Sequence, residues 1–250
     1  MQVLDIYNFL NEMAPVGTAL SFDNVGILVG DPNKEVKKAV VCLDATPKVL
    51  ELAVKESAEL IITHHPIIFE PLKCLIKGED NVVYGCIENG VSVISMHTNL
   101  DVAVGGVNDC LANSLELVDV ENVVDDEGFS FKKGALKFTM STTELADYVK
   151  QKLGGNVRYS AVEKAIETVC VCGGSGGSEL LLAMQNADAF ITADVKHNLF
   201  IEAVSKDYPL LDAGHYHTEN VVVKPLIQKL SEGLNGIEFL EFNSEVIKTL

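Results

Sequence analysis

The feature that most constrains the fold is a pattern of three short apolar segments that occurs twice along the chain. The segments are rich in β-branched residues and have the length of buried strands. The first two begin about twenty residues apart in both halves, with helical patterns between them. The alternation implies parallel pairing with right-handed crossovers. The segments are residues 40–43, 60–63 and 92–95 in the first half and 169–172, 189–192 and 210–213 in the second.

We therefore predict an α/β protein with two linked domains from a duplicated βαβ-type unit, each a three-layer domain with a mixed, mostly parallel sheet. The clearest break is the charged, turn-like stretch Asp125-Asp126-Glu127-Gly128. We expect a first α/β domain over residues 1–124 and a second over residues 125–250. Helices are expected over residues 2–13, 47–57, 107–115, 178–184, 199–204 and 221–230, with a further helix that Thr142 or Thr143 caps.

The charge balance limits the partners that the protein can have. Against 19 Lys and Arg there are 36 Asp and Glu, so the formal net charge is −17, which repels nucleic-acid phosphates and anionic lipids. No apolar run reaches the roughly 18 residues of a membrane span, and the start of the chain lacks a signal-peptide pattern. The six cysteines show no CxxC spacing, which favours reduced thiols in a cytoplasmic protein.

One strand of the first half ends in two adjacent histidines, in the segment Leu60-Ile61-Ile62-Thr63-His64-His65-Pro66. Pro66 has no backbone N–H, so we expect the strand to stop there. Both imidazoles then lie at the carboxyl end of a strand, where ligands bind in α/β sheets. Neighbouring strand residues point to opposite faces, so a shared site requires the strand to bend. The alternative is one histidine in the core beside one in solvent.

Two other strand ends carry a histidine with a carboxylate four positions later. His97 precedes Asp101 in the first half, and His215 precedes Glu219 in the second. When the halves are aligned, His97 falls on His215 and Asp101 falls on Glu219. An approximate two-fold relation between the halves would bring the two pairs face to face, with the adjacent histidines between them.

Imidazole nitrogen and carboxylate oxygen are the usual protein ligands of zinc, iron and manganese. One catalytic ion takes three or four protein ligands, and the set here is larger. It suits two ions about 3.5–4 Å apart, which lower the pKa of a water between them and polarise a carbonyl, phosphoryl or ring-carbon centre. We predict two divalent ions (Zn, Fe or Mn) per subunit, with His97 nearby and the ligands His64, His65, Asp101, His215 and Glu219.

The glycine-rich segment 173–177 lies between a strand and a helix and resembles an anion-binding loop. It lacks the ending of a P-loop and the spacing of a dinucleotide fingerprint, so a flexible strand–helix turn is the alternative. Asp194 and His197 form a further carboxylate–imidazole pair that could support the metal ligands. Ser175 and Ser178 have no evident base partner, which argues against a serine hydrolase. The sequence leaves the roles of the loop and of His197 open.

Four motifs carry a family resemblance: Ser21-Phe22-Asp23-Asn24-Val25-Gly26, Thr63-His64-His65-Pro66, Ser95-Met96-His97-Thr98-Asn99-Leu100-Asp101 and Gly214-His215-Tyr216-His217-Thr218-Glu219. In this order they are similar to the GTP cyclohydrolase 1 type 2 homologue family, also called NGG-interacting-factor-like. The resemblance covers essentially the whole chain. It implies two linked α/β domains from a duplicated unit, a dinuclear metal site between them and a toroidal homohexamer. It also implies that the five ligands named above bind the ions, that Glu219 contacts both ions and that His97 lines the site.

Two functions follow from these observations. The first is a dinuclear metal-dependent hydrolase that acts on GTP or a related small anionic nucleotide, with His97 as the candidate proton shuttle. The alternative is a non-enzymatic, metal-binding hexameric scaffold or regulatory protein, which the absence of a recognisable substrate-binding motif favours. The net charge of −17 disfavours a DNA-binding ring. No residue pattern specifies a guanine pocket, so the GTP activity is implied by the resemblance alone.

Overall fold

The computed structural model of the chain describes residues 1–78, 81–126, 128–243 and 245–247. These residues form two compact units, which we describe one at a time. Unit 1 comprises Met1–Val104 together with Val223–Ser244, and unit 2 comprises Gly105–Val222 together with Glu245–Leu250. No helix in these described ranges is both long enough and apolar enough to cross a membrane.

Unit 1 is built around a five-stranded sheet. Four of its strands run parallel, and the edge strand β1 (Gly26–Val29) is antiparallel to its neighbour. The strand order across the sheet is β1, β4 (Ser92–Ser95), β3 (Leu60–Thr63), β2 (Lys38–Cys42) and β11 (Glu238–Glu241).

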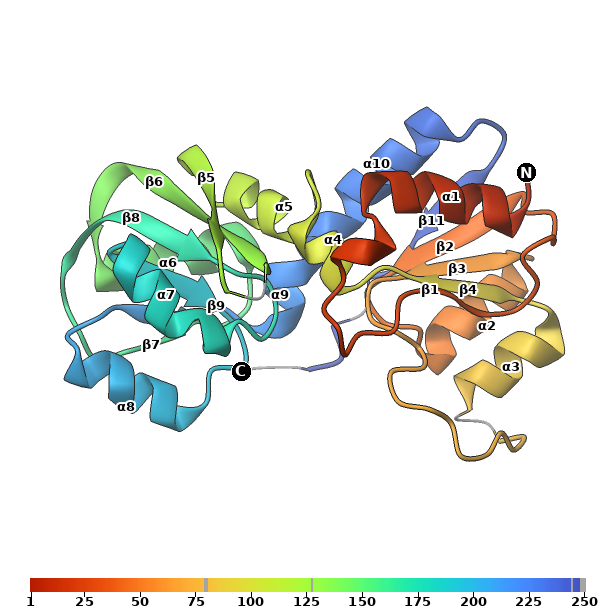
Figure 1. Cartoon of the computed structure of the whole chain (residues 1–250), viewed down its shortest axis with the longest axis horizontal. Coiled ribbons are helices and arrows are strands. Elements are labelled where there is room, and N and C mark those ends of the chain that lie inside the picture. The colour runs from red at the N-terminus through yellow and green to blue at the C-terminus, as the bar shows by residue number, and fades with distance from the viewer. Residues whose placement is uncertain (79–80, 127, 244, 248–250) are drawn as a thin grey trace. The chain divides into compact units, whose positions relative to one another are not determined.

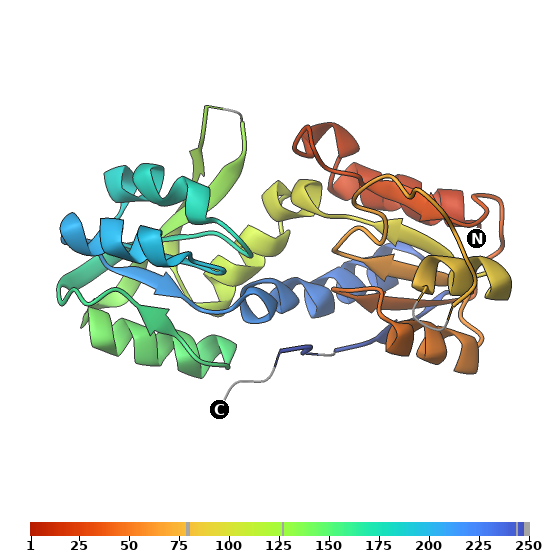
Figure 2. The same ribbon diagram turned by 90° about the horizontal axis from the view of Figure 1, so that it is seen from below.

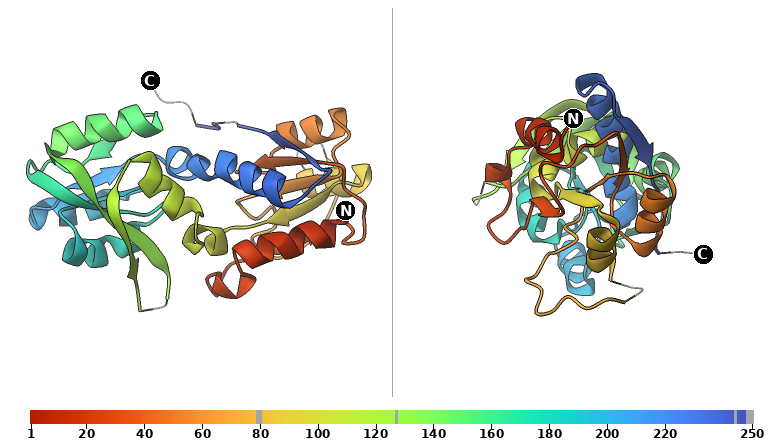
Figure 3. Two further views of the ribbon diagram at one scale, coloured as in Figure 1. Left: turned by 90° about the horizontal axis from the view of Figure 1, so that it is seen from above. Right: turned by 90° about the vertical axis from the view of Figure 1, so that its right-hand side faces the viewer.

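Helices cover both faces of the unit 1 sheet (Figure 1). Helices α2 (Pro47–Lys55) and α3 (Val82–Asn89) pack on one face, where their side chains share a buried cluster with strand residues such as Ile61. Helices α1 (Val3–Met13) and α10 (Val223–Gly233) lie together on the other face (Figure 3, left). The buried side chains of α1 recur at helical spacing, as the sequence predicts.

Unit 2 contains a six-stranded sheet. Its three central strands are parallel, and the strands that flank them are antiparallel. The hairpin of the first two strands extends beyond the helices of the unit (Figure 2). The strand order is β5 (Val118–Val124), β6 (Ser130–Ser141), β8 (Ala165–Val171), β9 (Ala189–Thr192), β10 (Leu210–Asp212) and β7 (Arg158–Tyr159).

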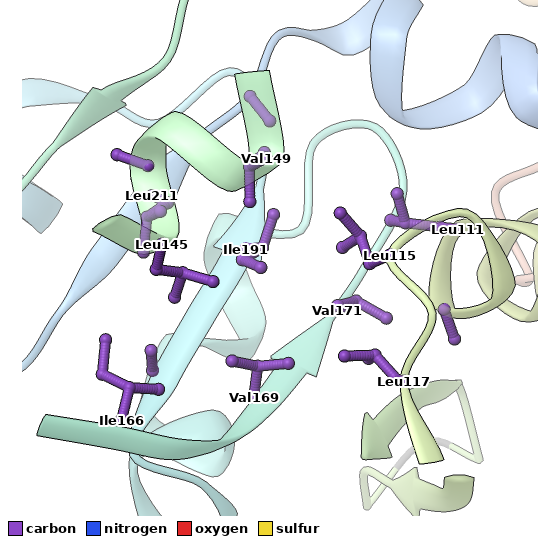
Figure 4. Packing of buried hydrophobic residues seen from close by; sticks show 14 residues of the cluster. Leu111, Leu115, Leu117, Leu145, Val149, Ile166, Val169, Val171, Ile191 and Leu211 are labelled. Carbon is purple, nitrogen blue, oxygen red and sulfur yellow. The ribbon is translucent and has the colours of Figure 1, made fainter. Parts of the chain in front are cut away.

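The unit 2 sheet also has helices on both faces. Leu111 of α5 (Val107–Ser114) and Leu145 of α6 (Thr142–Leu153) pack over Val169 and Ile191 on one face (Figure 4). Helices α7 (Leu180–Asn186) and α8 (His197–Ser205) pack over Phe190 on the other. Each unit is therefore a three-layer α/β structure with a mixed sheet, which confirms the predicted fold class.

The duplicated pattern is present, but its alignment shifts by one residue at the third strand. Ile61 lies opposite Val93 in unit 1, and its counterpart Phe190 lies opposite Leu210 in unit 2. Val93 therefore corresponds to Leu210, and counting onward pairs His97 with Gly214 instead of His215. The predicted alignment is wrong by one position because apolar strands resemble one another in composition, whereas backbone hydrogen bonding fixes the register.

The units divide the chain differently from the expected domain boundary. Val124 pairs with Ser130 across the β5–β6 hairpin, so the charged stretch around residue 125 is a hairpin connection inside unit 2, and Glu127 lies outside the described residues. The divisions fall after Val104, after Val222 and after Ser244 instead. The reason is that β11 pairs with β2 and returns the end of the chain to the first sheet, and no local charge pattern encodes such a return.

Several other elements differ from the sequence prediction, which did not include α3 or β5. Helix α6 begins one residue earlier than expected, because Ser141 forms a capping box: its hydroxyl accepts from the Glu144 N–H at 3.3 Å, and the Glu144 carboxylate accepts from the Ser141 N–H at 2.8 Å. Helices α4 (Thr98–Val102) and α9 (His215–Glu219) follow the third strand of each repeat. Both are too short to show a hydrophobic period.

A carboxylate on the surface of unit 2, that of Glu116, is paired with two lysines. Glu116 accepts hydrogen bonds from the ammonium groups of Lys137, at 2.7 Å, and Lys152. These two hydrogen bonds and the two positive charges lower the pKa of the Glu116 carboxyl to about 2. The interaction ties the start of β5 to β6 and to the end of α6.

Candidate metal centre

The two adjacent histidines lie where the parallel strands of unit 1 end. The His64 N–H donates to the Cys42 carbonyl at 3.2 Å and the His65 N–H to the Leu43 carbonyl at 2.9 Å, so the backbone still follows β2 beyond the last residue of β3. His64 is 3% exposed, whereas His65 is only partly buried. The strand end therefore presents both imidazoles at the carboxyl edge of the sheet, as predicted.

A third imidazole joins them from the end of β4. The ring centroid of His97 lies 5.2 Å from that of His64 and 5.6 Å from that of His65, and the two adjacent rings are 5.0 Å apart. One ring nitrogen from each of the three lies within 4.8 Å of the others. Asp101 of α4 approaches the same place, with Oδ1 3.5 Å from His64 Nε2. Unit 1 thus gathers three imidazoles and one buried carboxylate.

Each of these imidazoles is held through its Nδ1 atom by an oxygen acceptor. His64 Nδ1 lies 2.8 Å from the Met96 carbonyl oxygen, His65 Nδ1 lies 2.8 Å from Asp44 Oδ1, and His97 Nδ1 lies 2.8 Å from Asp23 Oδ1. An oxygen that only accepts fixes the ring proton on Nδ1. The Nε2 atom of each ring then carries a lone pair, and this is the arrangement by which proteins orient metal-binding histidines.

Asp23 is the functional residue that sequence reasoning missed, because its position before Asn24 and Val25-Gly26 reads as an ordinary turn. Its side chain is completely buried. Besides His97, it accepts from the Thr98 N–H at 3.0 Å and the Thr98 hydroxyl at 2.5 Å. Burial alone would raise the pKa of this carboxyl, but the hydrogen bonds from His97 and Thr98 lower it to about 2. Its place in the first of the four family motifs was the available signal.

Unit 2 gathers a smaller set of ligand groups on α9. His215 Nε2 lies 2.9 Å from Glu219 Oε2, one helical turn later, and His215 Nδ1 lies 2.7 Å from Asp194 Oδ2. Burial opposes the charged imidazole, but the Glu219 and Asp194 carboxylates outweigh it and raise the pKa of His215 to about 9. Asp194 therefore supports a candidate ligand, as expected. His197 lines a cavity beside Arg158 and Phe200.

The glycine-rich loop holds Glu219 in place. The Gly174 N–H donates to the Thr218 hydroxyl at 3.0 Å, and the Gly173 N–H donates to Asn108 Oδ1 at 2.8 Å. Gly174 has φ +60, and a Cβ atom there would collide with Glu219 Oε1. Side chains of unit 2 thus accept hydrogen bonds from the loop N–H groups that a bound anion would need. The close approach of Glu219 explains why position 174 is a glycine. This arrangement favours a supporting role over anion binding.

Nitrogen and oxygen donors of this kind fit borderline and hard divalent ions. The structure brings together His64, His65, His97 and Asp101 within unit 1, and His215 and Glu219 within unit 2. The joining of these two groups in a single centre stays a prediction. Residue groups that could hold a metal are nevertheless present at the positions that the sequence indicates.

Comparisons with known proteins agree with this picture. Residues 1–249 match the family described as Duf34/NIF3 (NGG1p interacting factor 3). A Clostridium perfringens protein named "GTP cyclohydrolase 1 type 2 homolog" is 31% identical over 250 residues, which cover 96% of this chain and 95% of that protein. The Drosophila melanogaster "NIF3-like protein 1" is 32% identical over 251 residues, covering 96% of this chain and 85% of that protein.

Solved structures with the same fold cover nearly the whole chain. A Staphylococcus aureus hypothetical protein has a TM-score of 0.89 with 26% sequence identity, covering 100% of this chain and 99% of its own. Reduced HcgD from Methanocaldococcus jannaschii has a TM-score of 0.85 with 28% identity, covering 98% of both chains. These matches confirm the family resemblance and the fold class.

Proposed function

The chain belongs to the Duf34/NIF3 family, and on that premise we propose that it is a dinuclear metal-dependent hydrolase acting on GTP or a related small anionic nucleotide. In this proposal the ligand groups of units 1 and 2 together hold two divalent ions, Zn, Fe or Mn. The residues that would hold the ions are His64, His65, Asp101, His215 and Glu219.

The observation that carries the proposal is the common orientation of the imidazoles. Four histidines from two units each direct Nδ1 to an oxygen acceptor at 2.7–2.8 Å. Such support is a regular companion of metal ligation. A buried imidazole needs a hydrogen-bond partner in any case, but three of these four acceptors are carboxylates, and one ring nitrogen from each of the three unit 1 histidines lies within 4.8 Å of the others.

The chain's own residues have distinct tasks in this proposal. Bound divalent ions supply Lewis acidity and lower the pKa of water. His97 moves a proton between the reacting water and the leaving group. Asp23 keeps the His97 ring in one orientation and one tautomer, because its carboxylate accepts from Nδ1 at 2.8 Å. For GTP, the reaction would consume water and release formate from the guanine imidazole ring.

We further propose that the active protein is a homohexamer in the cytoplasm. The family resemblance supports the assembly. No disulfide joins the six cysteines, all of which lie in the described part of the chain, and this is compatible with a reducing compartment. Sedimentation should then give a mass six times 27.0 kDa. A mass of one or two chains would contradict the hexamer and would leave the proposal of a metal site unaffected.

The first experiment is metal analysis of protein purified without added metal. We expect about two ions per chain, with a clear loss in His64→Ala and in Glu219→Ala. The second experiment incubates metal-loaded protein with GTP and follows formate and pterin products. Asp101→Ala is the control. Two bound ions without turnover above that control would reject the GTP hydrolase and leave the non-enzymatic scaffold or regulatory role.

A further inference from the structure

Two aromatic rings are exposed beside the imidazole cluster of unit 1. Phe22 is 62% exposed and Phe69 is 45% exposed. Their ring centroids are 6.2 Å apart with an interplanar angle of 62°. The ring of Phe69 also lies 6.2 Å from the His97 ring at 85°. Phe69 therefore contacts both the second aromatic ring and an imidazole of the candidate metal centre.

The backbone that carries these rings is fixed by the same motif that holds His97. Asp23, next to Phe22, accepts from His97 Nδ1. Asn24 Nδ2 donates to the Ile68 carbonyl at 2.6 Å, one residue before Phe69. Phe22 thus presents one ring, Asp23 is hydrogen-bonded to the His97 imidazole, and Asn24 is hydrogen-bonded to the segment that carries the second ring. The positions of both rings are set relative to the imidazole cluster.

Neither ring contributes to the buried core, although both are large and apolar. Single exposed apolar side chains are common and need no explanation. Phe22 and Phe69 are a different case, because the two rings are neighbours and lie beside the candidate metal-binding groups. Their faces offer a surface on which a planar ligand can stack next to those groups. Aromatic faces stack on nucleic-acid bases with little dependence on base identity.

We propose that Phe22 and Phe69 stack on the heteroaromatic base of a small nucleotide and hold its imidazole ring beside the metal-binding groups. This inference rests on the proposed function, since the reaction proposed there takes place at a carbon of that ring. The net charge of −17 opposes a long polyanion such as DNA or RNA, which favours a single nucleotide over a nucleic-acid strand. The rings would discriminate flat bases from ligands that carry phosphate alone.

The test compares two ligands that differ only in the base. GMP and ribose 5-phosphate are titrated into the metal-loaded full-length protein by calorimetry, with metal content measured before and after. We expect Phe22→Ala and Phe69→Ala to weaken GMP binding about 5- to 100-fold and to leave ribose 5-phosphate binding unchanged. The matched control is Phe138→Ala, which removes a ring that is 75% exposed on β6 in unit 2.

Each other outcome overturns the proposal in a recognisable way. If the wild type binds both ligands equally, the rings contribute nothing, while the metal-dependent function stands. If the loaded wild type binds neither ligand and shows no turnover, the proposed function fails as well. If Phe22→Ala or Phe69→Ala changes the sedimentation mass without weakening GMP binding, the rings belong to a contact with a second copy of the chain.

Discussion

The buried carboxylate of Asp23 gives the sharpest quantitative prediction, because it can be removed with hardly any change of shape. In Asp23→Asn an NH2 group replaces one of the two carboxylate oxygens. The side chain can then no longer accept all three hydrogen bonds that His97 and Thr98 donate to the carboxylate. The folded structure lowers the pKa of this carboxyl from 3.8 to about 2. Each pKa unit corresponds to about 1.4 kcal/mol, so the ionised form contributes about 2 kcal/mol of folding free energy at neutral pH.

The sign of the pH dependence follows from the direction of the shift. Because the pKa is lower in the folded chain than in the unfolded chain, the contribution is complete above about pH 4. It disappears as the pH falls from about 4 to about 2. The stability deficit of Asp23→Asn should therefore shrink over that range, as the wild-type carboxyl takes up its own proton.

Urea unfolding of metal-free protein at pH 7 and at successively lower pH values measures this effect. Glu51→Gln, which removes an exposed carboxylate from α2 in the same unit, serves as the control and should be close to neutral. A variant as stable as the wild type at pH 7 would refute the reasoning. So would a deficit that stays constant as the pH falls, because packing and not charge would then be responsible.

Three further predictions concern unit 2. Gly174→Ala should lose at least about 1 kcal/mol of folding free energy and bind less metal, because the added methyl group meets Glu219 Oε1; urea unfolding and metal analysis would show it. Asp194→Ala should lower the pKa of His215 from about 9 toward 6.5, observable by NMR titration of metal-free protein; an unchanged pKa would leave Glu219 as the sole cause. Glu116→Gln should destabilise the protein above about pH 4.5, with the difference vanishing as the pH falls through about 2, and a pH-independent deficit in urea unfolding would contradict this.

The one-residue shift between the repeats has a consequence for the site. His215 is the first residue of α9, so Glu219 lies one turn later on the same face and the two side chains meet at 2.9 Å. His97 instead precedes the first residue of α4. Asp101 approaches His64, and His97 turns to Asp23. The same spacing of histidine and carboxylate therefore produces two different arrangements.

The sequence by itself indicated the six strands of the repeated pattern, their parallel pairing and the candidate metal-binding groups. Apolar β-branched runs and histidines at strand ends are local patterns, and strand ends of a parallel sheet meet at one edge whatever the details. The sequence could not predict that β11 returns to the first sheet, the exact register of the third strands or the role of Asp23.

Only the tertiary structure decided those features, because each depends on partners far apart in the chain. Asp23 and His97 are 74 residues apart, and β11 pairs with a strand about two hundred residues earlier. Hydrogen bonds between such segments leave no periodic trace in the sequence. A carboxylate that reads as part of a turn becomes, once the chain is folded, the group that orients an imidazole.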